Sequence, residues 1–253
     1  MDTVIKESYP VQGETGEIYG ELYYPVTRDI KGTVILSHGY NGCHNDFDYE
    51  CRVFAENGYM AYAYDFSGGS VNTRSVSITH NEMTVFTEKS DLLCVFEGVS
   101  SHDLAKGKSI YLFGGSQGGF VTGLVLEELK DKVRASMLYY PAFNIPDDWR
   151  RNYPKEEEIP DITELMGMTL GRCYFEAIRD FYTFDNLGSY KGPLLIIYGD
   201  KDDIVPMSAI QQAMDTYENA ELIILKGEGH GFTTEGCKKA MERIIRYLSE
   251  LEK

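Results

Sequence analysis

The stretch YLFGGSQGGF, residues 111–120, limits the fold more than any other part of the chain. It places four glycines around Ser116, between an apolar run and a run that favours helix. Glycine allows turns and close backbone approaches that a side chain would block. A sharp strand-to-helix turn strains its apex residue and lifts that side chain out of the sheet. We therefore expect a strand over 109–114, a helix over 117–130, and the Ser116 hydroxyl exposed between them.

The rest of the chain alternates short apolar runs with helical patterns. Further strands are predicted at 17–25, 33–39, 59–65, 134–140, 193–199 and 221–227. Helices are predicted at 46–58, at 83–97 with Met83, Phe86, Leu93 and Phe96 at helical spacing, after Pro206, and at the C-terminal end with Ala240, Met241, Ile244, Ile245 and Leu248 on one stripe. Buried strands that alternate with helices predict the α/β class, with a mostly parallel sheet covered by helices on both faces.

One segment interrupts this alternation. Residues 141–190 separate two predicted strands by more residues than a simple crossover needs. The segment contains the only tryptophan, Trp149, an acidic run at 156–158 and a helical piece at 171–184. We interpret it as an insertion over the sheet edge, within a single domain that spans residues 1–253.

Composition narrows the classes of partner and compartment. The 253 residues carry a net charge of −16, which repels phosphate backbones and anionic lipid, so we expect no nucleic-acid and no membrane partner. The five cysteines are odd in number and form no C-x-x-C pair, which predicts neither a metal site nor a disulfide framework. The first residues lack an apolar signal region, and no apolar run approaches the length of a membrane span. These features predict a soluble, cytoplasmic protein.

Ser116 is the centre of a G-x-S-x-G motif, GGSQG at 114–118. The spacing does not match the G-x-G-x-x-G of a dinucleotide loop, and the G-K-S/T of a phosphate loop is missing, so we expect no cofactor. A serine hydroxyl becomes an effective nucleophile only when a base removes its proton. Ser116 is therefore the candidate nucleophile, and it needs a base and an acid elsewhere in the chain.

His230 is the candidate base. In a nucleophile turn of this kind the acid and then the histidine follow the serine, and of the five histidines only His230 does so. It lies in KGEGHGF, 226–232, directly after a predicted strand, where the active sites of such sheets collect. The acid must accept the imidazole proton and hold the tautomer. The loop YGDKDDIVP offers three acids, and spacing alone does not choose among them: Asp200, Asp202 and Asp203.

Several motifs together resemble the α/β-hydrolase family over nearly the full chain: SHGY, YDFSGGS, GGSQGG, GDKDDIVP and GEGHGF. The resemblance implies the α/β-hydrolase fold, with a mostly parallel eight-stranded sheet and a lid at the insertion over 141–190. It also implies a Ser-Asp-His triad that works without a metal or cofactor. The family's acid motif, G-x-x-D-x-x-V-P, selects Asp202 and leaves Asp203 in reserve. The chain departs from the G-H-S-x-G of many members, which removes one clue to the subfamily.

The same resemblance implies an oxyanion hole, in which two backbone N–H groups stabilise a tetrahedral intermediate. One N–H belongs to Gln117, the residue after the nucleophile. The match to the family's His-Gly-x places the other N–H at Tyr40. The residues that resemble loop-shaping positions, rather than bases, are His38, Asp65, Gly68 and Gly69.

The insertion is rich in aromatic residues, which either bind an apolar or aromatic acyl group or merely cover the sheet edge. They are Phe143, Trp149, Tyr153, Tyr174, Phe175, Phe181, Tyr182, Phe184 and Tyr190. The length of the insertion and the stretch PDITELMGMTLGRCYFEAIRDF resemble bacterial cinnamoyl and feruloyl esterases. In those enzymes polar lid groups hold the phenolic hydroxyl. Asp147 and Asp148 are therefore the candidate substrate-binding residues, together with Trp149.

We interpret the chain as a serine esterase that hydrolyses carboxylic esters through an acyl-enzyme, with hydroxycinnamoyl (feruloyl) esters as one substrate class. Three alternatives stay open: a short-chain acyl esterase or lysophospholipase, a peptidase of the prolyl oligopeptidase type, and a non-enzymatic ligand-binding member of the fold. Such peptidases usually carry a large N-terminal propeller, which these 253 residues do not contain. An intact set of Ser116, Asp202 and His230 counts against pure binding. The natural ester and the oligomeric state stay open, with a homodimer as one option.

Overall fold

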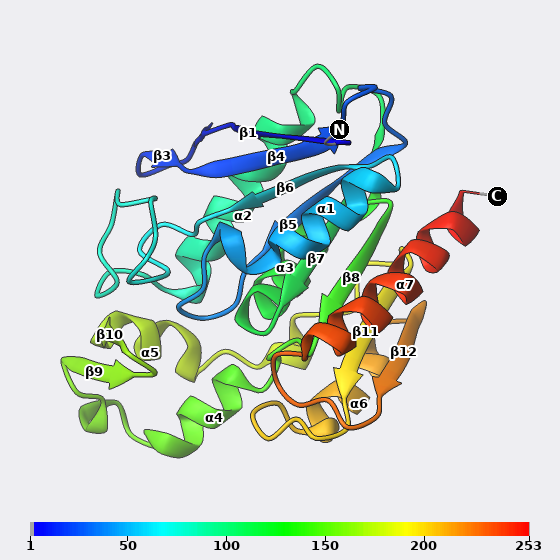
Figure 1. Ribbon diagram of the computed structural model, residues 1–253. Coiled ribbons are helices and arrows are strands. Elements are labelled where there is room, and N and C mark those ends of the chain that lie inside the picture. Colours follow the sequence, from blue (N-terminus) through cyan, green and yellow to red (C-terminus); the bar gives the residue numbers. More distant parts are fainter. Residues whose placement is uncertain (1–2, 253) are drawn as a thin grey trace.

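The structure, a computed structural model, describes residues 3–252, and eight of its strands form one sheet (Figure 1). These strands are β1 (Val4–Ser8), β4 (Gly20–Pro25), β5 (Gly32–Ser37), β6 (Met60–Tyr64), β7 (Ser109–Gly115), β8 (Ala135–Tyr139), β11 (Leu194–Gly199) and β12 (Ala220–Leu225). They lie in the order β1-β4-β6-β5-β7-β8-β11-β12. The pairings of β4 with β1 and β6 are antiparallel and the others are parallel. The mostly parallel eight-stranded sheet predicted from the sequence is thus confirmed.

Helices cover both faces of this sheet, as predicted (Figure 1). One face carries α1 (Asp48–Glu56) and α7 (Thr234–Leu251), and the other carries α2 (Val85–Ser100), α3 (Gln117–Leu129) and α6 (Met207–Thr216). Successive side chains of a strand point to opposite faces. In β5, Val34 and Leu36 therefore belong to the core under α1 and α7, whereas Ile35 belongs to the core on the other face. Within residues 3–252, no helix has the length and apolar character needed to cross a membrane.

The first strands differ from the prediction. The strand expected at 17–25 is divided into β3 (Glu17–Ile18), which pairs with β2 (Val11–Gln12), and β4. Between β3 and β4, the backbone N–H of Tyr19 donates to the Ser75 hydroxyl at 2.9 Å instead of to a neighbouring strand. The sequence pattern does not predict β1, because this edge strand is largely exposed and lacks an apolar run.

The buried side of α2 also differs from the predicted stripe. Phe96 is buried as expected, but Phe86 and Leu93 are only half buried, and Met83 precedes the helix. The other buried positions of the helix are Val85, Glu88, Asp91, Leu92, Val95 and Val99. This side is broad because α2 packs against α3, β2 and the insertion together. In α7 the predicted stripe is confirmed, with Ile245 at its partly buried edge.

The predicted insertion lies between β8 and β11. Its elements are α4 (Ile145–Asn152), η3 (Glu156–Glu158), β9 (Ile162–Leu165), β10 (Met168–Gly171), α5 (Arg172–Arg179) and η4 (Thr183–Asp185). Figure 1 shows α4, α5, β9 and β10 gathered at one end of the sheet. The helix predicted at 171–184 is shorter in the structure, because it ends at Arg179 and η4 follows after a short loop.

A hairpin in the insertion escapes sequence prediction. Strands β9 and β10 pair antiparallel, and the two residues between them, Met166 and Gly167, have φ values of 43° and 80°. Positive φ at both positions is typical of a tight hairpin turn, in which asparagine or aspartate usually precedes the glycine. Methionine at the first position gives no such signal, so the turn is not recognised from the sequence.

The insertion returns to β11 along α3. The backbone N–H groups of Gly188 and Ser189 donate to the Glu127 carboxylate of α3, at 2.9 and 2.8 Å. Tyr190, the next residue, is buried in the core. Neighbouring parallel strands require a connection that runs back along the sheet. The segment between β8 and β11 therefore builds the structure at one end of the sheet and also makes this crossover.

Candidate active site

Ser116 lies at the turn between β7 and α3, where the sequence predicts it. Its φ of 52° and ψ of −120° are rare for a residue with a side chain, so the backbone is strained there. Backbone hydrogen bonds hold this conformation. The Ser116 N–H donates to the Tyr139 carbonyl at 3.0 Å, and the Ser116 carbonyl accepts from Phe120 at 3.1 Å and from Ala142 at 3.0 Å.

Two glycines beside Ser116 are required by close backbone contacts. A Cβ atom on Gly118 would lie 2.2 Å from the carbonyl oxygen of His38 and 2.3 Å from that of Ser37. A Cβ atom on Gly114 would lie 2.4 Å from the carbonyl oxygen of Gly118. Glycine on both sides of Ser116 therefore lets the first turn of α3 pack directly against the ends of β5 and β7.

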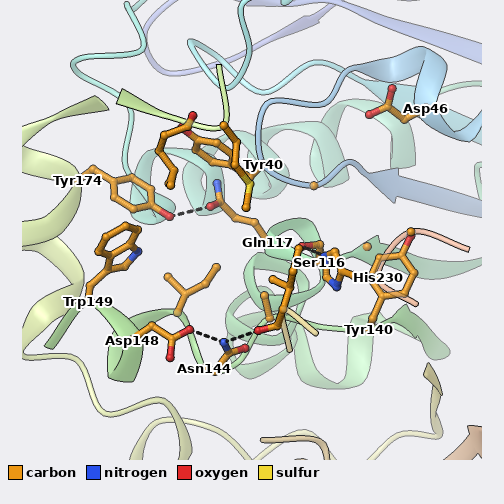
Figure 2. A pocket seen from close by; sticks show the side chains of 18 of the residues that line it. Tyr40, Asp46, Ser116, Gln117, Tyr140, Asn144, Asp148, Trp149, Tyr174 and His230 are labelled. Atoms are coloured by element: carbon orange, nitrogen blue, oxygen red, sulfur yellow. Dashed lines mark hydrogen bonds between the residues drawn. The ribbon is translucent and has the colours of Figure 1, made fainter. Parts of the chain in front are cut away.

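His230 and Asp202 complete a chain of hydrogen bonds that begins at Ser116. The Nε2 atom of His230 lies 2.8 Å from the Ser116 Oγ, and its Nδ1 atom lies 2.9 Å from Oδ2 of Asp202. The carboxylate can only accept, so Nδ1 carries the proton and Nε2 accepts from the serine hydroxyl. The three residues come from the ends of β7, β11 and β12 (Figure 2 shows Ser116 beside His230).

The structure distinguishes among the three aspartates of the loop after β11, which spacing alone could not do. The side chain of Asp202 is fully buried, and its second oxygen accepts from the N–H groups of Ile204 and Val205 at 2.9 and 2.8 Å. Burial alone would raise the pKa of Asp202, but hydrogen bonds from His230 and from these N–H groups outweigh it and lower the pKa. Asp200 instead accepts from Gly227 at 2.5 Å, and Asp203 is exposed.

Glu228 braces the loop that carries His230, a contact that the sequence analysis missed. Its buried carboxylate accepts from both the N–H and the hydroxyl of Thr233, the N-cap of α7, at 2.7 and 2.8 Å. Its carbonyl accepts from the N–H of Lys201 at 2.8 Å, which ties the histidine loop to the acid loop. On the other side, the His230 ring packs on Tyr140 with 4.6 Å between centroids.

Tyr40 and Gln117, the residues predicted to form an oxyanion hole, both lie beside Ser116. The loop that carries Tyr40 packs closely against the serine, because a Cβ atom on Gly39 would lie 3.2 Å from Cβ of Ser116. Among residues 3–252, no protein group accepts a hydrogen bond from the backbone N–H of Tyr40 or Gln117. Both N–H groups are therefore free to bind a substrate oxygen.

His38 precedes this loop, and its ring nitrogens bond to the backbone rather than to Ser116 or His230. Its Nδ1 atom donates to the Gly39 carbonyl at 2.7 Å, and its Nε2 atom accepts from the Phe66 N–H at 3.1 Å. Burial lowers the pKa of His38, which keeps the ring neutral in this donor-and-acceptor role. These contacts fit the loop-shaping role that the sequence analysis expects for it.

A cavity of about 430 Å³ opens beside Ser116 and His230, a size typical of small-molecule sites (Figure 2). The insertion supplies much of its wall. Of the predicted substrate-binding residues, Asp148 and Trp149 line the cavity, whereas Asp147 does not. Asp147 pairs with Arg150, while Asp148 pairs with Arg151 and accepts from Asn144 at 2.5 Å.

Tyr174, one of the aromatic residues that the sequence offered for an acyl group, also lines the cavity. Other wall residues and one buried acid were not identified from the sequence as site residues. The wall residues include Asn144, Ile145, Leu165, Met166 and Ile204. Behind them, Gln117 Nε2 donates to Glu88 Oε2 at 2.8 Å, and the Tyr174 hydroxyl donates to Gln117 Oε1 at 2.7 Å. Burial raises the pKa of Glu88 to about 8, so this carboxyl group is mainly protonated at neutral pH. One signal was available: Glu88 lies three residues after Val85 and four before Leu92, on the apolar side of α2.

Residues 45–252 match the prolyl oligopeptidase family (Peptidase_S9). The chain belongs to this family. It is also 30% identical over 138 residues to the caffeoylshikimate esterase of Arabidopsis thaliana, a match that covers 53% of this chain and 40% of that protein. The chain thus spans less than half the length of this curated relative.

Solved structures show the fold. Est1E from Butyrivibrio proteoclasticus, solved with bound ferulic acid, superposes with a TM-score of 0.86 at 22% identity and covers 96% of this chain and 98% of its own. The α/β hydrolase GrgF from Penicillium sp. sh18 superposes with a TM-score of 0.73 at 16% identity, with 98% and 97% of the chains covered. The fold is therefore the α/β-hydrolase fold that the sequence motifs imply.

Proposed function

We propose that this protein is a serine hydrolase that cleaves carboxylic esters through an acyl-enzyme. The observation that carries the proposal is the hydrogen-bonded chain from Ser116 through His230 to Asp202, with the serine hydroxyl at the wall of a cavity. A hydroxyl, an imidazole and a buried carboxylate in this sequence of contacts can activate the hydroxyl as a nucleophile.

The first half of the reaction forms the acyl-enzyme. His230 Nε2 takes the proton from the Ser116 hydroxyl as Oγ bonds to the ester carbonyl carbon. The imidazolium then gives this proton to the departing alcohol oxygen. In the second half, water attacks the acyl carbon, loses its proton to His230, and Ser116 leaves protonated again. Asp202 keeps the ring in the required tautomer and stabilises the imidazolium.

The negative charge of each tetrahedral intermediate needs donors that are already in place. We assign this role to the backbone N–H groups of Tyr40 and Gln117, because both lie beside Ser116 and neither has a protein acceptor among residues 3–252. Gln117 also begins α3, so its N–H points out of a helix N-terminus, where partial positive charge favours an anion.

For the acyl group we propose a hydroxycinnamoyl ester, such as a feruloyl ester. Trp149 and Tyr174 give the cavity an aromatic wall, and Trp149 is itself fixed by an edge contact with Phe175 at 4.7 Å. Asp148 supplies an oxygen that can accept a phenolic O–H. The names of two similar proteins, a caffeoylshikimate esterase and an esterase solved with ferulic acid, support the same acyl class.

We further propose that the insertion over 141–190 is a lid within a single domain. Its helices α4 and α5 and its hairpin supply Ile145, Trp149, Leu165 and Tyr174 to the cavity wall. The shape of the acyl site thus depends on this segment, whereas the reacting groups belong to the sheet.

A peptidase activity is the second candidate, because the chain belongs to the prolyl oligopeptidase family. The same serine, histidine and aspartate would cleave an amide after proline. The two candidates differ in the leaving group and in the side chain that the cavity must accept.

A substrate panel tests the proposal. Methyl ferulate, 4-nitrophenyl acetate and an N-blocked glycyl-proline 4-nitroanilide should be compared by kcat/KM, with Ser116→Ala as the control for each. We expect methyl ferulate to be the best substrate and Ser116→Ala to lose all three activities. A preference for the prolyl anilide would favour the peptidase, and binding of ferulate without any turnover would favour a binding protein.

A further inference from the structure

The side chains of Tyr40 and Gln117, the two proposed oxyanion-hole residues, both hold the insertion. The Tyr40 hydroxyl donates to the carbonyl of Leu165 at 3.1 Å, at the end of β9. Beside it, the Asn41 side-chain amide donates to the carbonyl of Met166 in the hairpin turn, also at 3.1 Å. Tyr40 and Asn41, which are neighbours in the loop after β5, therefore hold the tip of the β9–β10 hairpin.

Gln117 holds the insertion at a second point. Its side-chain oxygen accepts from the Tyr174 hydroxyl of α5, and its side-chain nitrogen donates to Glu88 of α2 (the Tyr174–Gln117 bond is drawn in Figure 2). Gln117, Tyr174 and Glu88 are each at most 2% exposed, so these polar groups have few other partners. Loss of one bond would leave a buried polar group unpaired, which is costly.

The two points of attachment belong to one unit. Strand β10 ends at Gly171, and α5 begins at the next residue, Arg172. The Arg172 N–H donates to the Asp161 carbonyl at 2.9 Å, which extends the pairing of β9 with β10 to the first residue of α5. A displacement of the hairpin therefore moves the start of α5, and Tyr174 lies within the first turn of that helix.

We propose that the side chains of Tyr40 and Gln117 couple the docking of the insertion to the geometry of the oxyanion hole. The inference rests on the proposed function. When the hairpin and α5 lie over the cavity, both side chains are held and their backbone N–H groups face the same point beside Ser116. When the insertion lifts, both restraints are lost together. Because an oxyanion donor must be placed within a few tenths of an ångström, the hole then stabilises the intermediate less well.

Tyr174 and the Tyr40 hydroxyl are therefore positioning residues for the hole and not only parts of the acyl pocket. The two roles make different predictions for a small ester. The acetyl group of 4-nitrophenyl acetate is too short to need the aromatic wall, so a residue that only recognises the acyl group has little effect on it. A residue that positions the oxyanion donors affects acetate and ferulate esters alike.

Tyr174→Phe and Tyr40→Phe test the coupling, because each removes one hydroxyl and keeps the ring and the backbone. We expect kcat for 4-nitrophenyl acetate to fall about ten-fold in each variant, less than the 10²- to 10³-fold loss of a whole donor. KM should change less than two-fold, and kcat for methyl ferulate should fall by the same factor. The double variant should lose less than the product of the single losses, because both bonds report on one docking event.

Tyr182→Phe is the matched control. Tyr182 lies in the same insertion, is 55% exposed, packs its ring under Arg150 and does not line the cavity. Its kcat should equal that of the unchanged protein. Thermal melts of all variants test whether a loss in kcat comes from a loss of folded protein. Phenylboronic acid, which bonds to the serine Oγ as a tetrahedral adduct, gives a second reading: its inhibition constant should rise in step with the loss in kcat.

The coupling is overturned if Tyr174→Phe and Tyr40→Phe lower turnover of methyl ferulate while acetate turnover and boronate inhibition stay unchanged. That result would restrict both hydroxyls to acyl recognition. Failure of the proposed function looks different, since the unchanged protein would then hydrolyse neither ester. In that case, equal reaction rates of a fluorophosphonate with Ser116 in the unchanged protein and both variants would overturn the coupling as well.

Discussion

The loops that carry Ser116, Asp202 and His230 differ from the insertion in how the chain holds them. The loops are short and are tied by backbone hydrogen bonds to strand ends and to each other, as in the bond from Lys201 to the Glu228 carbonyl. The insertion over the cavity docks through side chains, and its hairpin exposes apolar residues such as Ile162 (51%) and Met166 (66%). The proposed reacting groups thus lie on loops that are tied by backbone hydrogen bonds, whereas much of the cavity wall is held through side chains. Substitutions of the proposed reacting groups should therefore lower kcat far more than substitutions in the insertion.

The largest expected effect is in the loops that carry the proposed reacting groups. Ser116→Ala should lower kcat for every ester by at least about 10⁵-fold, because the nucleophile and its base act as one unit. The fold and the melting temperature should be preserved, since the hydroxyl is not needed to hold the turn. A fluorophosphonate probe followed by mass spectrometry should label Ser116 in the unchanged protein and no residue in the variant. Labelling of another serine would move the nucleophile elsewhere.

The acid gives the next largest effect. Asp202→Asn should lower kcat by about 10⁴-fold, because the amide favours the wrong tautomer of His230. Asp203→Asn is the matched control, since that neighbouring side chain is exposed, and it should keep nearly full activity. The reverse pattern would assign the acid role to Asp203. If both variants stayed active, the acid would have to come from another loop, although Asp147 and Asp148 are engaged with arginines.

Glu228 tests whether the rigidity of the loops matters for rate. Glu228→Ala removes both acceptors of Thr233, so we expect a loss of about 2 kcal/mol in the free energy of unfolding. The kcat should fall about ten-fold with KM unchanged, because His230 is then less well oriented. Glu235→Ala removes an exposed acid in the first turn of α7; it is the control and should change kcat and stability little. Unchanged kcat in a destabilised Glu228→Ala would restrict Glu228 to a purely structural role.

The last prediction concerns the buried acid behind the cavity, and its readout is the free energy of unfolding rather than turnover. The pKa of Glu88 is about 8 in the folded protein against a usual 4.5, so the folded state holds a proton that the unfolded state releases. Between these pH values the free energy of unfolding should fall by about 1.4 kcal/mol per pH unit on this account. Glu88→Gln keeps an acceptor for Gln117 but does not titrate. The variant should therefore gain stability relative to the unchanged protein as the pH rises from 5 to 8.

Urea unfolding at several pH values measures this difference. Asp91, whose pKa burial raises to about 6, is present in both proteins, so its contribution largely cancels. Parallel stability curves for the two proteins would show that Glu88 is already ionised in the folded state.

The same division separates what the sequence predicts from what it does not. The strand, the glycine-flanked turn and the order of acid and histidine are local features, and the structure brings Ser116, Asp202 and His230 together. The cavity wall depends on contacts between distant segments, such as Tyr174 with Gln117, 57 positions apart. No local pattern indicates such a contact. Of the two acids proposed for the wall, Asp147 pairs with Arg150 and does not line the cavity, whereas Asp148 does. The two residues are adjacent on one helix, so only the packing of α4 determines which of them faces the cavity.

The crossover role of the insertion limits how such a protein can be redesigned. Because β8 and β11 are parallel neighbours, the chain between them cannot be replaced by a tight loop, and a dozen or more residues must remain. The leg from Gly188 to Tyr190, held by Glu127 on α3, is part of this passage. A graft of a new specificity segment should therefore exchange residues between Ile145 and Arg179, keep the contact of Tyr174 with Gln117, and leave the return leg intact. The substrate range can then vary with the exchanged segment, while the topology of the sheet fixes the path by which the chain returns to β11.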